Sequence, residues 1–391
     1  MRTQVGIVGA GPAGLLLSHL LHLAGIGSVI VESRSRAHVE ARIRAGVLEQ
    51  GTVDTLVESG LGERLAREGL VHRGIHLSFG GARHAIDFEQ LTGHSVTIYG
   101  QHEVVKDLLD ARTRAGADIV FEVEETSVYD LDSERPVIRY RKDGQDQEIV
   151  CDFIAGCDGY HGVCRPSIPP GVLRIFERTY TFAWLGILAD APATSDELVY
   201  ANHERGFALY SMRSPELTRL YLQCRADEDI ADWPDERIWD ELHRRLETDA
   251  GWRVAEGPIL QRGITPLRSV VVEPMRYGRL YLAGDAAHIV PPTGAKGLNL
   301  AVADVRVLAK ALASFYRAGR TALLDAYSAT CLERTWRVQR FSWWMTAMLH
   351  RFDASTEFDR QIQLAELSYV TSSRAAARSL AENYVGLPLS V

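Results

Sequence analysis

Short apolar runs that end in a glycine or an acidic residue recur along this chain, and each is followed by a stretch of helical periodicity. Residues 4–8 lead through a glycine-rich turn into a leucine-rich stretch that stops at Gly25, and the next apolar run ends in Glu32. Residues 280–282 precede Gly284 and Asp285, and apolar positions three or four apart then follow from residue 298 to 312. Such runs are typical of strands buried on both faces, so the pattern predicts an α/β fold with a parallel sheet.

A second pattern, alternation of apolar and polar residues, predicts an inserted β-region. Alternation occurs within residues 72–97, and residues 207–213 and 218–225 form a predicted hairpin around Ser214 and Pro215. Residues 149–154 are predicted as one apolar strand, residues 102–115 and 236–246 as helices, and the chain beyond Arg317 as helical. The predicted domains are a discontinuous Rossmann-like domain (1–71, 98–175 and 266–315), a mainly β domain (72–97 and 176–265) and a C-terminal helical region (316–391).

Composition limits the classes of protein that this chain can belong to. The 391 residues carry a net charge of −8 and 46% hydrophobic residues, and no apolar run approaches the roughly 18 residues that span a membrane. Net negative charge argues against a general nucleic-acid binder. The five cysteines include no C-x-x-C pair, so neither a disulfide framework nor a metal site is indicated. We therefore expect a soluble cytoplasmic protein without a metal, a nucleic-acid partner or a membrane partner.

A dinucleotide fingerprint opens the chain. Gly9, Gly11 and Gly14 have the spacing G-x-G-x-x-G between a strand and a helix, and Glu32 follows eighteen residues later at the end of the next strand. The glycines allow a tight turn and close approach to a pyrophosphate, while the acid can bind ribose hydroxyls. A glycine pattern alone is weak evidence, but this context predicts nucleotide binding.

Further chemistry is expected where other strands end. Asp158 and Asp285 follow apolar runs, and a helix beginning near Gly297 directs free N–H groups to the same edge of the sheet. This arrangement favours an anion or an electron-rich ring. On the predicted hairpin, one face carries Ser211 and Arg213 beside Arg219, Tyr221 and Gln223, a set suited to a carboxylate, although a solvated face is the alternative. Arg42 and Arg44 can meet phosphates or be merely solvated.

Taken together, the three strand ends and several longer runs resemble the flavoprotein aromatic hydroxylases, and among them those that act on 4-hydroxybenzoate. The runs that carry the resemblance are residues 42–51, 154–159, 282–300, 340–345 and 382–388. The resemblance extends over essentially the whole chain. It implies a monooxygenase that hydroxylates 4-hydroxybenzoate to 3,4-dihydroxybenzoate with FAD, NAD(P)H and O2 through a flavin hydroperoxide.

The resemblance also implies roles for individual residues. FAD would be held by Gly9, Gly11, Gly14, Glu32, Arg42, Arg44, Gln101, Asp158, Arg219, Asp285, Gly297, Leu298 and Asn299. The aromatic acid would contact Tyr200, Ser211, Arg213, Tyr221, Pro292 and Thr293. Tyr200, Tyr384 and His72 would carry the phenolic proton away, with Pro292 and Asn299 completing the catalytic group.

The nicotinamide site is the part of the resemblance that departs most from the family pattern. Arg34, Arg44, His161, Arg165 and Arg268 are the expected contacts. The segment after Glu32 contains Arg34 and Arg36, which can bind a phosphate, and Glu40, which would repel one. The preference between NADPH and NADH therefore stays open. No second dinucleotide fingerprint exists, so the nicotinamide is expected to bind transiently at the surface.

Two other functions and one assembly are compatible with the sequence. A related hydroxylase of another phenol, such as 3-hydroxybenzoate or an aminobenzoate, is the first alternative. A flavin-fold carrier without turnover is the second. The apolar Trp343 and Trp344 segment needs a partner surface and, with the family, predicts a homodimer.

Overall fold

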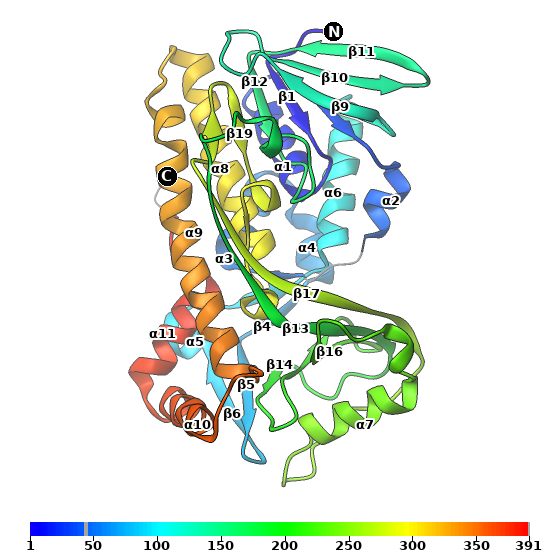
Figure 1. Ribbon diagram of the computed structural model, residues 1–391, viewed down its shortest axis with the longest axis vertical. Coiled ribbons are helices and arrows are strands. Elements are labelled where there is room, and N and C mark those ends of the chain that lie inside the picture. Colours follow the sequence, from blue (N-terminus) through cyan, green and yellow to red (C-terminus); the bar gives the residue numbers. More distant parts are fainter. Residues whose placement is uncertain (43–45, 390–391) are drawn as a thin grey trace.

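A six-stranded, mostly parallel sheet forms the upper part of the molecule in the computed structural model, which describes residues 1–42 and 46–389 (Figure 1). Its order is β18 (Arg276–Tyr277), β19 (Leu280–Leu282), β12 (Phe153–Gly156), β1 (Val5–Val8), β2 (Ser28–Glu32) and β8 (Asp118–Phe121). Only β18 pairs antiparallel. Helix α1 (Pro12–Leu23) packs against α6 (Gln101–Arg114) and α8 (Gly297–Ala318). The predicted parallel α/β core is confirmed.

An eight-stranded mixed sheet forms the lower part. Its order is β20 (His288–Ile289), β17 (Ile259–Glu273), β13 (Arg174–Asp190), β16 (Leu217–Arg225), β15 (Ala208–Met212), β14 (Leu198–Ala201), β5 (Gly74–Phe79) and β6 (Ala82–Asp87). Helix α7 (Asp235–Leu246) buries Ile238, Leu242 and Leu246 against this sheet. The predicted hairpin corresponds to β15 and β16, which pair antiparallel.

Two small sheets and four short helices complete these parts. The sheets are β11 (Gln145–Val150), β10 (Val137–Lys142) and β9 (Glu124–Tyr129), and β3 (Val47–Leu48), β7 (Val96–Ile98) and β4 (Leu70–His72). The helices are α2 (Arg36–Ala41), α3 (Gln50–Glu58), α4 (Gly62–Glu68) and α5 (Phe88–Thr92).

The prediction of one strand over residues 149–154 is wrong. Strands β11 and β12 belong to different sheets, and the chain changes partner between them. The backbone N–H of Cys151 donates to the carbonyl of Pro136, just before β10, whereas the N–H of Asp152 donates to the carbonyl of Gln4, just before β1. An apolar run cannot reveal this change, because both sheets bury the same residue types.

Two long strands and one long helix connect the upper and lower parts (Figure 1). Strands β13 and β17 pair antiparallel along most of their 17 and 15 residues. They run through the expected domain boundaries at residues 175/176 and 265/266, so the two parts share continuous strands. Helix α9 (Ala322–Leu349) has 28 residues, which corresponds to about 42 Å.

The C-terminal region is helical, as predicted, and its end is tied to the rest of the chain. Helices α10 (Glu357–Ser372) and α11 (Arg374–Val385) pack against each other, and α11 also contacts α5. Arg334 of α9 donates from Nη1 to the carbonyl of Leu387 at 2.7 Å. None of the helices in the described ranges is both long enough and apolar enough to cross a lipid bilayer.

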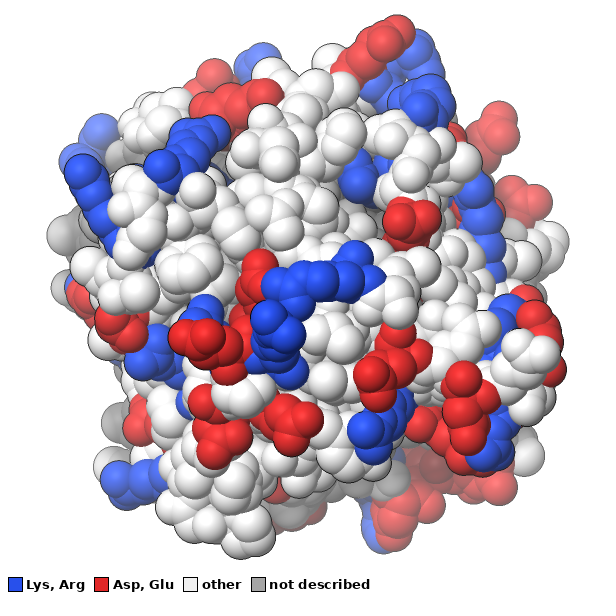
Figure 2. Space-filling view, turned by 90° about the horizontal axis from the view of Figure 1, so that it is seen from above, with Lys and Arg blue, Asp and Glu red and all other residues white. Residues whose placement is uncertain are grey.

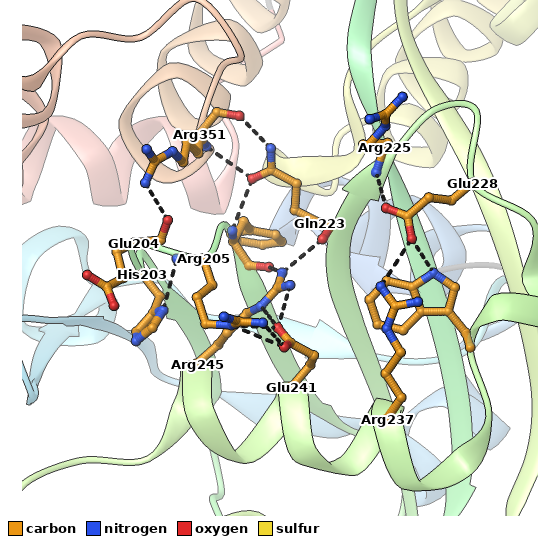
Figure 3. Close-up of polar contacts among 12 residues, drawn as sticks. His203, Glu204, Arg205, Gln223, Arg225, Glu228, Arg237, Glu241, Arg245 and Arg351 are labelled. Carbon is orange, nitrogen blue, oxygen red and sulfur yellow. Dashed lines mark hydrogen bonds and ion pairs between the residues drawn. The ribbon is translucent and has the colours of Figure 1, made fainter.

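A buried polar cluster anchors the open end of the hairpin (Figure 3). Arg245 of α7 donates to Glu241 at 2.7 Å and to the carbonyl of Gln223 at 2.8 Å. The side chain of Gln223 in turn donates to the carbonyl of Arg351 and accepts from its N–H. Because these groups come from α7, β16 and the segment after α9, the cluster holds the hairpin against α7 and against that segment.

Candidate functional site

The turn between β1 and α1 fits a pyrophosphate. Gly9 has φ +103, and a Cβ there would lie 2.5 Å from the carbonyl oxygen of Cys157. A Cβ on Gly14 would lie 2.0 Å from the carbonyl oxygen of Gly9, whereas the space beside Gly11 is open. Helix α1 begins after Gly11 with no side-chain cap. Its first N–H groups are therefore available to a ligand.

Acidic side chains at two strand ends hold backbone N–H groups. Glu32 accepts from the N–H groups of Ala10 and Arg34, both at 2.8 Å. Asp158 accepts from the N–H of Cys164 at 2.8 Å, while its Oδ1 is buried and has no hydrogen-bond partner among the described residues. Burial raises the pKa of Asp158, and the hydrogen bonds from backbone N–H groups oppose this. Both carboxylates thus shape the ligand-facing turns.

The amide of Asn299 braces the start of α8. Its Oδ1 accepts from the N–H of Glu49 at 2.9 Å and from the hydroxyl of Thr52 at 2.8 Å. Its Nδ2 donates to the carbonyls of Val47 and Ala295, both at 2.9 Å. These four bonds use both donor hydrogens and both lone pairs of the amide. Asn299 therefore positions the backbone around α8 rather than offering a free polar group.

A buried ion-pair network beside this brace was not predicted. Lys296 donates from Nζ to Glu49 and to the carbonyl of Tyr384, both at 2.7 Å, and Arg334 donates to Glu49 at 2.9 Å. Burial lowers the pKa of Lys296, and the charge of Glu49 opposes this. The network ties the start of α8 to the C-terminal helix. The only sign of this network in the sequence was a lysine in the short turn from Gly294 to Gly297.

The other predicted cofactor residues lie at the ends of elements. Asp285 is half-buried in the turn after β19, Gln101 begins α6, Gly297 and Leu298 begin α8, and Arg42 is exposed after α2. Arg44 lies outside the described residues. Because β1 and β19 are parallel strands of one sheet and α1 packs against α8, the glycine turn, Asp285 and the start of α8 share one edge of that sheet.

The hairpin brings together two guanidinium groups, and neither pairs with a carboxylate in the part of the chain that the structure describes. Ser211 is paired with Arg219 across the strands, and Arg213 follows directly after β15. Nη1 of Arg213 and Nη1 of Arg219 are buried and have no hydrogen-bond partner within the described ranges. Burial and the neighbouring Arg219 lower the pKa of Arg213, while Tyr221 opposes them. The arrangement suits an anionic ligand.

Two phenol groups meet in the core next to this hairpin. The hydroxyls of Tyr200 and Tyr384 lie 2.5 Å apart, and either can be the donor. Burial raises the pKa of both phenols, and the pKa of Tyr200 is raised further by Tyr384 and Tyr221. His72, at the end of β4, is fully buried. Two phenols that are 184 residues apart in sequence therefore share a buried hydrogen bond.

The turn before α8 presents Pro292 and Thr293 differently. Pro292 is exposed, whereas Thr293 is fully buried and its hydroxyl lies 2.8 Å from that of Thr346 on α9. The contact with α9 fixes the turn that leads into α8.

Three of the expected nicotinamide contacts surround one aromatic ring. The guanidinium of Arg165 lies 4.4 Å from the ring centroid of Tyr160, that of Arg268 lies 4.9 Å away, and the ring of His161 lies 5.0 Å away. Arg34 is exposed and lies between β2 and α2, apart from this group in sequence and sheet position. The structure therefore clusters three of the five expected residues, and Arg44 falls outside the described ones.

Charges elsewhere are mixed. Figure 2 shows acidic and basic side chains interspersed over the upper face. All five cysteines are free and buried, and no group of metal-ligating side chains was found within residues 1–42 and 46–389.

Comparison with known proteins gives concordant results. A family model described as "FAD binding domain" matches residues 2–342. The p-hydroxybenzoate hydroxylase of Acinetobacter baylyi is 50% identical over 392 residues, which cover 100% of this chain and 97% of that protein.

Solved structures show the same fold. The p-nitrophenol 4-monooxygenase of Pseudomonas putida has a TM-score of 0.84 at 20% identity, covering 99% of both chains. The anhydrotetracycline hydroxylase of Streptomyces rimosus has a TM-score of 0.76 at 23% identity, covering 98% of this chain and 76% of that one. The family match and the relative at 50% identity establish that this chain belongs to the FAD-dependent flavoprotein aromatic hydroxylases.

Proposed function

We propose that this flavin monooxygenase hydroxylates 4-hydroxybenzoate to 3,4-dihydroxybenzoate, with NAD(P)H as reductant. The observation that carries the proposal is the buried Nη1 of Arg213, which has no hydrogen-bond partner among the described residues. A buried cation of this kind needs an anionic partner, and a benzoate supplies one. The relative at 50% identity, a p-hydroxybenzoate hydroxylase, supports the same substrate.

The carboxylate and the phenol of this substrate would meet different groups. Arg213, Ser211 and Tyr221 would hold the carboxylate, since a guanidinium binds a planar carboxylate through two parallel hydrogen bonds. Tyr200 would accept the phenolic proton and pass one to Tyr384, which contacts it at 2.5 Å. The resulting phenolate is far more nucleophilic than the phenol. Burial of both tyrosines keeps water from the reacting ring.

Bound FAD, once reduced by the nicotinamide, would supply the chemistry that activates O2 so that one of its oxygen atoms can be transferred to the ring. Gly9, Gly11 and Gly14 would admit its pyrophosphate, and the start of α8 would face its ring system. Pro292 would direct its backbone carbonyl to the phenol, and Arg219 would influence the flavin position.

The reductant is proposed to bind at Tyr160, with Arg165, Arg268 and His161 around it. Arg36 is already paired with Glu40 at 2.7 Å and with Asp110 at 3.0 Å. Arg34 is therefore the more available cation of this segment for a 2′-phosphate. The rates of flavin reduction by NADPH and by NADH decide which of the two is preferred.

A homodimer in the cytoplasm is also proposed. Trp343 is exposed on α9, and α10 carries exposed Phe358, Ile362 and Tyr369, which is more apolar surface than a lone helix usually shows. Five free buried thiols fit a reducing compartment.

The proposal is tested by flavin reduction in the purified holoprotein, measured by stopped flow with NADPH and with NADH. The ligands compared are 4-hydroxybenzoate, 3-hydroxybenzoate and 4-aminobenzoate, with product analysis under air. We expect 4-hydroxybenzoate to accelerate reduction most and to yield 3,4-dihydroxybenzoate. Acceleration by another phenol alone would assign a different substrate, and hydrogen peroxide as the only product would refute hydroxylation.

A further inference from the structure

Glu197 connects the buried His72 to the surface. It directly precedes β14, the strand that carries Tyr200. Its Oε1 accepts from the N–H of Arg73 at 2.8 Å, and its Oε2 lies 3.2 Å from Nδ1 of His72. The imidazole is 0% exposed, whereas the carboxylate side chain is 23% exposed. The buried ring thus contacts an acidic group that reaches water.

The same carboxylate lies in the surroundings of Tyr384. The ring of Phe88 is 4.8 Å from that of Tyr384, and the N–H of Phe88 donates at 2.7 Å to the carbonyl of Arg73, the residue after His72. Burial raises the pKa of Tyr384, and the negative charge of Glu197 adds to the rise. Tyr384, His72 and Glu197 therefore share one electrostatic environment.

The contact between His72 and Glu197 leaves both side chains free to form a hydrogen bond with each other or with another group. Both ring nitrogens of His72 and Oε2 of Glu197 are buried and make no hydrogen bond with any described residue. The two side chains are within hydrogen-bonding distance, but the contact is not aligned as a hydrogen bond. Hydrogen bonds of proton-transfer groups are often loose before the ligand binds.

We propose that Glu197 is the outlet of the phenolic proton. The inference rests on the proposed function. One proton leaves the ligand's hydroxyl for Tyr200, Tyr384 releases one towards His72, and His72 delivers one to Glu197, which gives it to water. Each intermediate group gains one proton as it loses one, so only O–H and N–H bonds change. The net products are the phenolate of the ligand and a hydronium ion in the solvent.

The other charged groups around Glu197 leave this path open. The guanidinium of Arg73 is turned outward, where its Nε lies 3.3 Å from Glu89, and both side chains are largely exposed. His76 on β5 is the other nearby imidazole. Burial and the charge of Arg83 lower the pKa of His76, while Glu197 opposes them. Glu197 is thus the acid in direct contact with His72.

The test is the rate at which bound 4-hydroxybenzoate ionises in the oxidised holoprotein. The complex is jumped from low to high pH in a stopped-flow instrument, and phenolate formation is followed by its ultraviolet absorbance. Glu197→Gln keeps an oxygen for the N–H of Arg73 but cannot accept a proton. We expect ionisation to slow by roughly a hundredfold, with unchanged ligand affinity, FAD content and circular dichroism. Added formate should restore the rate in this variant.

Glu89→Gln is the matched control, because it removes the same charge beside the same arginine without touching His72. It should ionise the ligand at the parent rate. The inference is overturned if Glu197→Gln also keeps the parent rate. It is likewise overturned if both variants slow equally, because the loss of a negative charge near the site, and not the loss of a proton acceptor, would then explain the effect. A parent protein that fails to bind or ionise 4-hydroxybenzoate would overturn the proposed function as well, which distinguishes the two failures.

Discussion

Arg213 is a buried cation near the guanidinium of Arg219 and the phenol of Tyr221, and no carboxylate among the described residues pairs with it. Holding such a group without an anion costs free energy, and the cost is visible in its lowered pKa. A ligand carboxylate would remove that cost when it binds. If Arg213 binds the substrate as proposed, it exchanges stability of the free protein for affinity, as binding sites commonly do.

Replacing Arg213 separates these two effects. Arg213→Ala should weaken binding of 4-hydroxybenzoate by about 3 kcal/mol, roughly a hundredfold. It should leave the melting temperature of the ligand-free protein unchanged or higher, because an unpaired buried charge is lost. Equilibrium titration and thermal unfolding measure the two quantities.

Arg225→Ala is the control for this change. It removes a cation from the same strand pair, but Arg225 is exposed and already paired with Asp227 at 2.7 Å. Affinity for 4-hydroxybenzoate should not change. Equal binding by the Arg213 variant and the parent would show that the carboxylate lies elsewhere.

Helix α8 organises the site through three side chains, each of which holds a different segment. Lys296, just before the helix, binds Glu49 and the C-terminal helix, and Asn299 binds the chain around β3. One turn further, Asp304 accepts from the N–H of Gly284 at 2.9 Å and contacts Nε2 of His288 at 2.6 Å. The turn that contains Gly284 and Asp285 is thus held in place by the buried pair of Asp304 and His288.

This pair makes stability depend on pH. Burial lowers the pKa of His288, but the charge and hydrogen bond of Asp304 outweigh it, so the pKa is raised above 6.5. When folding raises the pKa of a histidine, its charged form stabilises the fold. This contribution is complete at pH values below the pKa of the imidazole in the unfolded chain, and it is lost as the pH rises through the pKa in the folded protein. His288→Gln should therefore lower the melting temperature by a few degrees at about pH 6, and by less at higher pH.

The control is His94→Gln, which alters an exposed imidazole. Its melting temperature should follow that of the parent at every pH. A destabilisation by His288→Gln that is the same from acid to alkaline pH would show that the pair acts by packing and not by charge.

Three elements extend through both parts of the molecule and hold them together, namely strands β13 and β17 and helix α9. Helix α9 also carries Arg334, which binds Glu49 and the carbonyl of Leu387. Packed against this frame, α10 buries Leu367 and Val370 and leaves Phe358, Ile362 and Tyr369 exposed along one stripe on its other side.

That stripe is where we expect the second subunit to bind. Ile362→Glu would place a negative charge in the interface. Because removing a charge from water costs free energy, this variant should convert the dimer to monomers at micromolar concentration. Sedimentation equilibrium measures the change, and affinity for FAD should be retained. Ser368→Glu, an exposed polar position on another side of α10, should leave the dimer intact. A parent protein that sediments as a monomer would refute the interface.

Local chemistry was enough to predict the glycine turn of Gly9, Gly11 and Gly14, the hairpin of β15 and β16, and the helix that begins at Gly297, because each depends on residues near one another in the chain. Contacts between distant segments were not accessible in this way. The pairing of Lys296 with Glu49 spans 247 residues, and the contact of Glu197 with His72 joins the segment before β14 to β4, a strand of another sheet. The change of sheet at Cys151 was also missed. Such features depend on which buried surfaces pack together, and apolar residues that look alike in sequence do not specify their partners.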